Sequence, residues 1–316
     1  MAEKKLSKRE KFRKYLDIFF SSIVLLSFGM VLMILVIYYY NKSFEKQQAD
    51  FANRYAMVIK NETNLYVDEA ERVLLSISRL PETEKSGSQS CQKELSQILI
   101  EAKIFANIAI AEKDGHFSCA ARSEALNLNV FDRSYFQKAV ESKSFVIGGY
   151  ILSRATSERM MIFSYPLLND KKEVEKVLVA GIKVAELEKN LKEIELTEGF
   201  AAAIVDSNGT LLAEAPITDS VGKPYKNQRI FLFALENGRG MINDFSDNER
   251  KKVSILPSDD GSYFIIVSAP VRSFISTASH LGKKYWLVVL FPYILILIPF
   301  VLLRKYFGCQ QNNAKK

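Results

Sequence analysis

The sequence is poor in the residues that most often carry out chemistry. It has only two histidines, His116 and His280, and three cysteines in 316 residues. It also contains no HExxH, GxSxG or P-loop motif. So few and such widely separated histidines and cysteines do not make a metal-ligand cluster, and His116 falls in a turn, where a solvated side chain is the usual case. We therefore expect no catalytic residue, no metal site, no cofactor and no enzymatic activity in this chain.

Charged residues are missing from two long stretches, Ile18 to Tyr40 and Tyr285 to Leu303. As helices rising about 1.5 Å per residue, each could cross a hydrocarbon layer about 30 Å thick. Neither has the polar stripe of a soluble surface helix, and tyrosines or tryptophan lie at one end of each. We predict transmembrane helices at 18–40 and 283–303. The first is too long for the apolar part of a signal peptide and precedes no small-residue cleavage site, so it should remain as an anchor.

The net charge of +7 is concentrated at the two ends of the chain. Residues before Asp17 carry a net +5 and residues after Leu303 a net +4, so the long middle part is close to neutral. Basic residues beside membrane helices stay on the cytoplasmic side, although Lys283 and Lys284 argue mildly the other way. We expect cytoplasmic tails at 1–17 and 304–316 of a bacterial inner-membrane protein. Segment 41–282 would be periplasmic or extracellular, and nucleic-acid binding is disfavoured.

Two cysteines, Cys91 and Cys119, lie in this exterior segment, whereas Cys309 belongs to a cytoplasmic tail. An exterior compartment allows disulfides, which need the two Cα atoms within about 7 Å. Either the two residues form a disulfide or they are two unrelated buried thiols.

The exterior segment begins with a helical pattern from Ser43 to Leu80, which Pro81 ends. Such a helix would be about 57 Å long and would act as a stalk. Its aromatic and aliphatic residues are either a dimer interface or the face packed against the protein's own modules. These residues are Phe44, Phe51, Tyr55 and Val58.

After the stalk, apolar strand-like segments alternate with short helical ones. We expect strands at 104–112, 117–121, 145–152, 159–168, 174–184, 200–206, 210–214, 250–256 and 263–270, and helices at 132–141, 185–196 and 227–236. Asp132 is placed to cap the first of these helices. The segment AIAEKDGHFSCA aligns with AIVDSNGTLLAE without a gap, Gly115 against Gly209. The repeated order predicts an α+β fold with two tandem modules of antiparallel sheet.

Several stretches, taken in order, resemble the double Cache (PDC) sensor domains of bacterial transmembrane receptors. They are FDRSYF at 131–136, IGGY at 147–150, LSRAT at 152–156, FSYPL at 163–167 and VAGI at 179–182. Cys91 before a Leu-rich helix and Cys119 after the Asp-Gly hairpin also fit the family. The resemblance covers about residues 43–272, and the nearest relatives look like the sensor halves of diguanylate cyclases.

The resemblance implies two PAS-like modules behind a long N-terminal helix. The membrane-distal module, at about 81–198, would hold the ligand pocket, and the smaller proximal module would span about 199–275. The family commonly forms homodimers through the long helix. An exterior signal shifts the helices and reaches an output domain inside the cell.

The candidate ligand-binding residues are Arg133, Tyr135, Tyr150, Arg154 and Lys183. Arginine grips carboxylates bidentately, and tyrosine adds a hydroxyl to an apolar wall, so converging cations would favour an anionic ligand. Alternatively these residues have only structural roles, with Arg133 exposed on the first turn of the helix and Tyr135 packed in the core. Where amino-acid-sensing members carry an acid, this chain has Lys183, which would repel a ligand ammonium.

Only 13 residues follow Leu303, so we expect any output domain to belong to a separate signalling protein. The favoured function is a membrane-anchored sensor of a small, anionic ligand. The alternatives are a ligand-free Cache-fold assembly or dimerisation protein, and the truncated sensor half of a diguanylate cyclase or histidine kinase.

Overall fold

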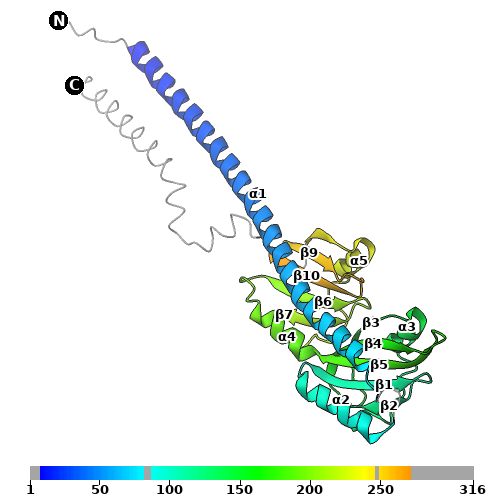
Figure 1. Cartoon of the computed structure of the whole chain (residues 1–316). Helices are drawn as coiled ribbons and strands as arrows, with labels where there is room; N and C mark the ends of the chain where they lie inside the picture. The colour runs from blue at the N-terminus through cyan, green and yellow to red at the C-terminus, as the bar shows by residue number, and fades with distance from the viewer. Residues whose placement is uncertain (1–7, 82–86, 246–248, 272–316) are drawn as a thin grey trace. The chain divides into compact units, whose positions relative to one another are not determined.

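The computed structural model describes residues 8–81, 87–245 and 249–271 (Figure 1). The chain separates into two compact units. The described part of the first ends at Lys46, and the second runs from Gln47 to Val271. The second expected membrane span, 283–303, lies outside the described residues, as do the tail at 304–316, His280 and Cys309.

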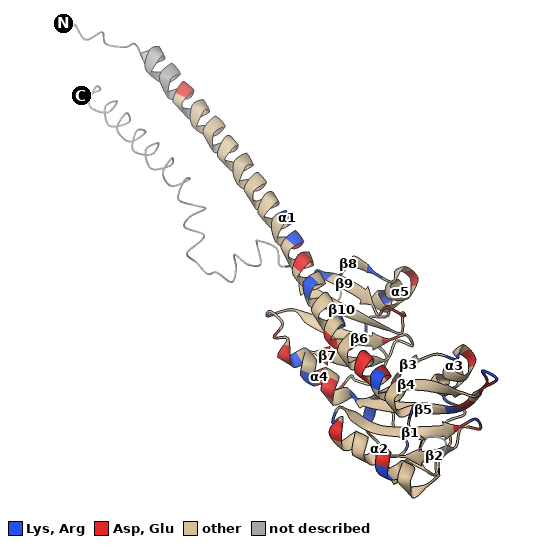
Figure 2. Ribbon diagram, viewed as in Figure 1, with Lys and Arg blue, Asp and Glu red and all other residues tan. Residues whose placement is uncertain are grey.

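One helix, α1 (Lys8–Ile77), contains the first apolar stretch and the expected stalk as far as Ile77, whereas the prediction extended to Leu80. Within its N-terminal part the large apolar side chains are exposed, for example Val24 at 64% and Leu25 at 68%. Figure 2 shows that no charged residue interrupts this stretch between Asp17 and Lys42. Among the described residues α1 is the helix long and apolar enough to cross a membrane, and the anchor predicted at 18–40 belongs to it.

The first module holds a five-stranded antiparallel sheet in the order β2-β1-β5-β4-β3. Its strands are β1 (Phe105–Glu112), β2 (Phe117–Ala120), β3 (Val146–Leu152), β4 (Arg159–Leu168) and β5 (Val174–Lys183). Helix α2 (Gln89–Glu101), the short 3-10 helix η2 (Ser123–Ala125) and α3 (Ser134–Ser142) complete it. Ser88 caps α2, because its hydroxyl accepts a hydrogen bond from the backbone of Cys91 at 3.3 Å.

The second module repeats this order of strands as β7-β6-β10-β9-β8. Helix α4 (Val184–Glu193) leads into β6 (Ala201–Asp206), β7 (Leu211–Ala215), α5 (Gln228–Asn237), β8 (Gly240–Asp244), β9 (Lys251–Pro257) and β10 (Tyr263–Pro270). Gly115 and Gly209 occupy matching turns with φ of +86° and +82°, a conformation that favours glycine. The predicted α+β fold with a long N-terminal helix and two antiparallel sheets is confirmed.

A continuous core joins α1 to both sheets (Figure 1). Small residues such as Ala52 and Ala56, both fully buried, let the helix approach the sheets closely. Phe51 and Tyr55 also pack against this core, and the Tyr55 hydroxyl lies 2.8 Å from that of Thr197. These two stalk residues therefore face the protein's own modules. The opposite faces of the sheets are covered by α3 in the first module and α5 in the second.

Two local expectations were wrong, and one strand was not expected. Asp132 does not cap α3, since the helix starts at Ser134 after Arg133 and has no side-chain cap. Cys91 lies inside α2 and not before it. Strand β8 was not expected, because its sequence GMIND is short and half polar; it is a strand by virtue of its pairing with β9.

Candidate functional site

A cavity lies on the α3 side of the first sheet. Its floor comes from β1, β4 and β5, and its rim comes from α3 and from the segments that precede α3 and follow β3. The cavity has a volume of about 50 Å³, which is room for a few waters or a small ligand. Most lining residues are apolar: Ala109, Phe117, Ala125, Leu128, Val130, Ile151, Ala155, Met160, Ile162, Val179 and Gly181.

Two arginines, Arg133 and Arg154, lie at the rim of the cavity. They differ in whether the protein itself pairs them. Arg133 occupies the N-cap position of α3 in an extended conformation, which places it at the cavity. Among the residues that the structure describes, no hydrogen bond or ion pair engages its guanidinium group. Its charge acts on the neighbouring Asp132 and Tyr135.

Tyr135 is the buried polar group of the cavity, with only 3% of its surface exposed. Burial raises the pKa of its phenol to about 12, although the charges of Arg133 and Arg154 lower it in part. The phenol therefore stays protonated at neutral pH and can donate a hydrogen bond. Within the described ranges its hydroxyl has no hydrogen-bond partner, which suits it to a ligand oxygen.

Arg154 is already paired. Its guanidinium donates to both carboxylate oxygens of Asp132, at 3.2 and 2.7 Å, and to the carbonyl oxygen of Asn129 at 3.3 Å. The hydrogen bond to Arg154 lowers the pKa of Asp132 below its usual value, and the same bond raises the pKa of Arg154. Arg154 thus closes the rim and is largely neutralised there.

Two further polar residues line the cavity. Asn107 lies at a bulge in β1, where its side-chain oxygen accepts from the backbone of Arg122 at 3.2 Å. Its amide NH₂ has no partner in the described part of the chain. The Ser153 hydroxyl accepts from the backbone of Ala155 and Thr156, both at 3.2 Å. The lining contains no aspartate or glutamate. The polar groups left for a ligand are the Arg133 guanidinium, the Tyr135 hydroxyl and the Asn107 amide, all of which can donate to an anion.

The structure brings Arg133, Tyr135 and Arg154 together but places Tyr150 and Lys183 elsewhere. The Tyr150 ring packs against the core of the second module, and its hydroxyl approaches Gly222. Lys183 donates from Nζ to the carbonyl oxygen of Lys103 at 3.2 Å. Neither lines the cavity, so two cations meet there, and not three. Asn107 was not among the residues predicted from the sequence, although a polar residue inside the apolar run IFANIAIAE is a signal that could have indicated it.

A disulfide joins α2 to β2, in the core that the first sheet shares with α1. The sulfur atoms of Cys91 and Cys119 are 1.98 Å apart and their Cα atoms 6.3 Å apart. Both residues are buried. Across the described residues no group of three or more His, Cys, Asp or Glu side chains could hold a metal ion.

A family model described as "Cache domain" matches residues 40–289. Solved structures share the fold at low sequence identity. An extracellular domain assigned to a histidine kinase, rpHK1S-Z16, gives a TM-score of 0.63 at 20% identity, over 71% of this chain and 95% of that one. Methyl-accepting chemotaxis protein X gives 0.60 at 17%, over 72% and 98%. The ligand-binding domain of the Campylobacter jejuni chemoreceptor Tlp3, in complex with L-valine, gives 0.56 at 11%, over 73% and 95%. No curated protein matches the chain significantly.

Proposed function

Because this chain belongs to the Cache domain family, we propose that it is a membrane-anchored sensor that binds a small carboxylate in the cavity of its first module. Segment 41–282 lies outside the bacterial inner membrane, between transmembrane helices at 18–40 and 283–303, with both termini in the cytoplasm. The chain acts as a binding protein and not as an enzyme. It forms a homodimer and passes the signal across the membrane to a signalling protein.

The proposal depends on one observation, the unpaired donors that meet at the cavity. The Arg133 guanidinium and the Tyr135 hydroxyl both line it without a protein partner among the described residues. The Tyr135 hydroxyl can donate one hydrogen bond into the cavity, and a guanidinium binds a carboxylate through two parallel hydrogen bonds. A ligand carboxylate would satisfy both groups, and the Asn107 amide adds a further donor.

The same lining disfavours amino acids. Tlp3 is solved with L-valine, but an amino acid brings an ammonium group that needs an acceptor of opposite charge. No Asp or Glu lines this cavity, and Asp132, which precedes the lining residue Arg133, is held by Arg154. The small, mostly apolar space therefore suits a short carboxylate without an amine.

A thermal-shift experiment on the full chain in lipid nanodiscs tests this function with matched ligands. Propionate and alanine have the same carbon skeleton and differ by the ammonium group. We expect short carboxylates to raise the melting temperature, with about 2.7 kcal/mol of stabilisation at a concentration 100-fold above Kd, and alanine to have little effect. Arg133→Ala should abolish the shift. Lys138→Ala removes an exposed cation from the same helix α3 and should preserve it.

Two results would count against the proposal. If no short carboxylate changes the melting temperature, the cavity is not a carboxylate site. If Arg133→Ala responds like the wild type, the ligand binds elsewhere.

A second candidate function is a ligand-free assembly module. Met57, Val58 and Leu65 on α1 are exposed at 43%, 45% and 58%, and such residues are suited to helix–helix contact between two chains. Both functions include association of two chains, so the thermal-shift response separates them. A sensor responds to a short carboxylate, whereas an assembly module responds to no small molecule.

A further inference from the structure

Asp206 joins the two modules through a buried carboxylate. It is the last residue of β6 and only 1% exposed. Its Oδ1 accepts hydrogen bonds from the backbone of Asn208 at 3.0 Å and Thr210 at 2.8 Å, which orders the turn that follows. Its Oδ2 accepts from the backbone of Tyr150 in the first module, at 3.0 Å. Three N–H groups thus compensate the buried charge.

The first module is shaped to receive this carboxylate. A bulge in β3 puts Gly149 in the left-handed region, at φ +77°. A Cβ atom there would lie 2.7 Å from Oδ2 of Asp206, so any other residue would be strained in its backbone and would displace the carboxylate. Among the described strands β3 is at the edge of its sheet and pairs only with β4. The N–H of Tyr150 can therefore donate to a group outside the sheet, which is Oδ2 of Asp206. The contact is therefore a built junction between β3 and the second module.

On one side this junction adjoins the cavity. Tyr150 is followed directly by Ile151, and Ser153 and Arg154 come next; all three line the cavity. A ligand that moves this rim moves the strand that Asp206 holds.

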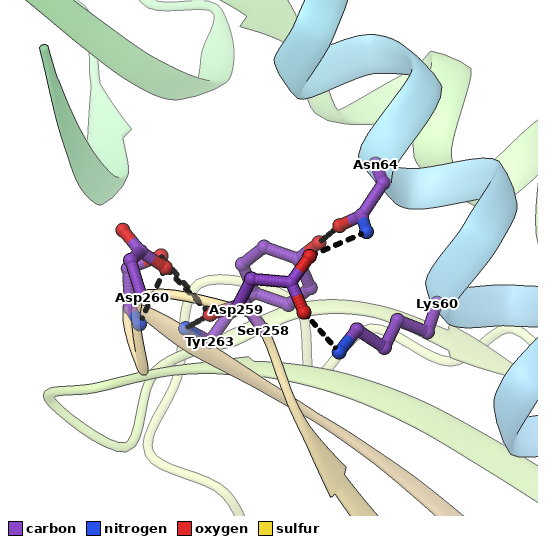
Figure 3. Close-up of polar contacts among 7 residues, drawn as sticks. Lys60, Asn64, Ser258, Asp259, Asp260 and Tyr263 are labelled. Carbon is purple, nitrogen blue, oxygen red and sulfur yellow. Dashed lines mark hydrogen bonds and ion pairs between the residues drawn. The ribbon is translucent and has the colours of Figure 1, made fainter.

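On the other side the junction leads to α1. Asp206 pairs with Tyr263 across β6 and β10, and the Tyr263 hydroxyl donates to Oδ1 of Asn64 (Figure 3). One turn along α1, Nζ of Lys60 lies 2.6 Å from Oδ1 of Asp259, in the turn between β9 and β10. Figure 3 shows Lys60 and Asn64 reaching from the helix to this turn. A continuous set of contacts thus runs from the cavity to α1, the helix that contains the apolar stretch.

We propose that Asp206 is the positioning residue that couples the cavity rim to α1. Removing its contact with Tyr150 uncouples the two modules while each keeps its own fold. The signalling meaning of this coupling rests on the proposed sensor function, but the coupling itself can be measured without any ligand.

The substitution Asp206→Asn separates the two roles of the carboxylate. Asparagine keeps one oxygen for the turn amides of Asn208 and Thr210. Its NH₂ group replaces the other oxygen and cannot accept the N–H of Tyr150. Asp206→Ser, whose hydroxyl still suits the turn but is too short to reach Tyr150, is the second variant if the first does not fold. Asp219→Asn removes an exposed carboxylate from the same module and is the matched control.

Hydrogen exchange on the full chain in nanodiscs measures the coupling. Arg154→Ala perturbs the rim by removing its bonds to Asp132 and Asn129. With Asp206 intact, we expect Arg154→Ala to speed amide exchange in residues 257–263 about fivefold, because the opening of one region loosens those coupled to it. With Asp206→Asn or Asp206→Ser the same change should speed exchange less than about twofold, and with Asp219→Asn the fivefold effect should persist.

Each outcome decides the matter. Equal acceleration with and without Asp206 would show that coupling bypasses this residue. No acceleration in the wild-type background would show that the rim and the turn at α1 are not coupled. A chain that binds no carboxylate can still pass this test, so failure of the sensor function and failure of the coupling are distinguishable.

Discussion

Loss of the disulfide between Cys91 and Cys119 should cost a large share of the stability of the sensor segment. The two cysteines are 28 residues apart. In the chain-entropy account, closing a loop of that length removes about 12 cal/mol/K from the unfolded state, so the crosslink contributes about 3.6 kcal/mol at 25 °C. Both residues are buried, at 1% and 2% exposure, and reduction keeps both sulfur atoms in place. Reduction therefore isolates the crosslink, whereas Cys91→Ala with Cys119→Ala also removes packing.

Urea unfolding of the full chain, followed by tryptic cleavage of the exterior segment, measures this contribution. With a slope of roughly 2–3 kcal/mol per molar urea, reduction should lower the midpoint by roughly 1–2 M. The double alanine variant should unfold at slightly lower urea still, and dithiothreitol should not affect it. A reduced wild type that unfolds within about 0.3 M of the oxidised protein would refute the reasoning. The reasoning would also be refuted if Cys91 and Cys119 were found as free thiols in protein isolated from cells.

Three further predictions concern single residues. Tyr135→Phe should weaken binding of a short carboxylate roughly 2- to 10-fold in calorimetry, with no loss of melting temperature, because the hydroxyl has no partner among the described residues. The hydrogen bond from Lys60 lowers the pKa of Asp259 in the folded protein. The stability difference between wild type and Lys60→Ala in urea titrations should therefore be present above about pH 4 and decrease as the pH falls through the folded pKa; a difference that grows on acidification would contradict this. Gly148→Ala should cost about 1–3 kcal/mol in urea unfolding, because its Cβ would lie 2.3 Å from Cγ2 of Ile162 and 2.5 Å from Cβ of Tyr135. If the variant is as stable as the wild type, Ile162 and Tyr135 shift to make room for the added methyl group at no cost.

Strands and helices with strong apolar patterns were predictable from the sequence. Strands β4 and β10 have the bounds expected, and most other elements agree within one or two residues. A continuous run of apolar residues, buried over most of its length, decides these two strands locally. Strand β8 depends on a partner strand instead, and GMIND carries little pattern of its own.

The membership of the cavity was harder to predict, because side-chain direction in β3 depends on a bulge. The register of β3 against β4 shifts between Ile147 and Gly149, and one inserted residue reverses which side chains face the cavity. Ile151 consequently lines the cavity and Tyr150 turns to the second module. Lys183 ends β5 on the expected strand, but its flexible side chain reaches a backbone carbonyl at Lys103. The positions of the Tyr150 and Lys183 side chains could not be predicted from residue type or spacing.

The two modules share one order of strands but differ in the size of the side chains at equivalent positions. Ala109 and Ala203 are equivalent positions on β1 and β6, yet their neighbours on the next strand differ in size: Val179 in the first module and Ile266 in the second. Asn107 pairs with a glycine, Gly181, at the cavity. In the second module large side chains fill the corresponding face. Phe231 packs edge-on to Phe264 with ring centres 6.3 Å apart, and Tyr150 enters from the first module. A close-packed core transmits displacement because it has little room to absorb it. Small residues and unpaired donors therefore leave room for the proposed ligand in the first module, whereas the corresponding face of the second module is closed by its packing against α5.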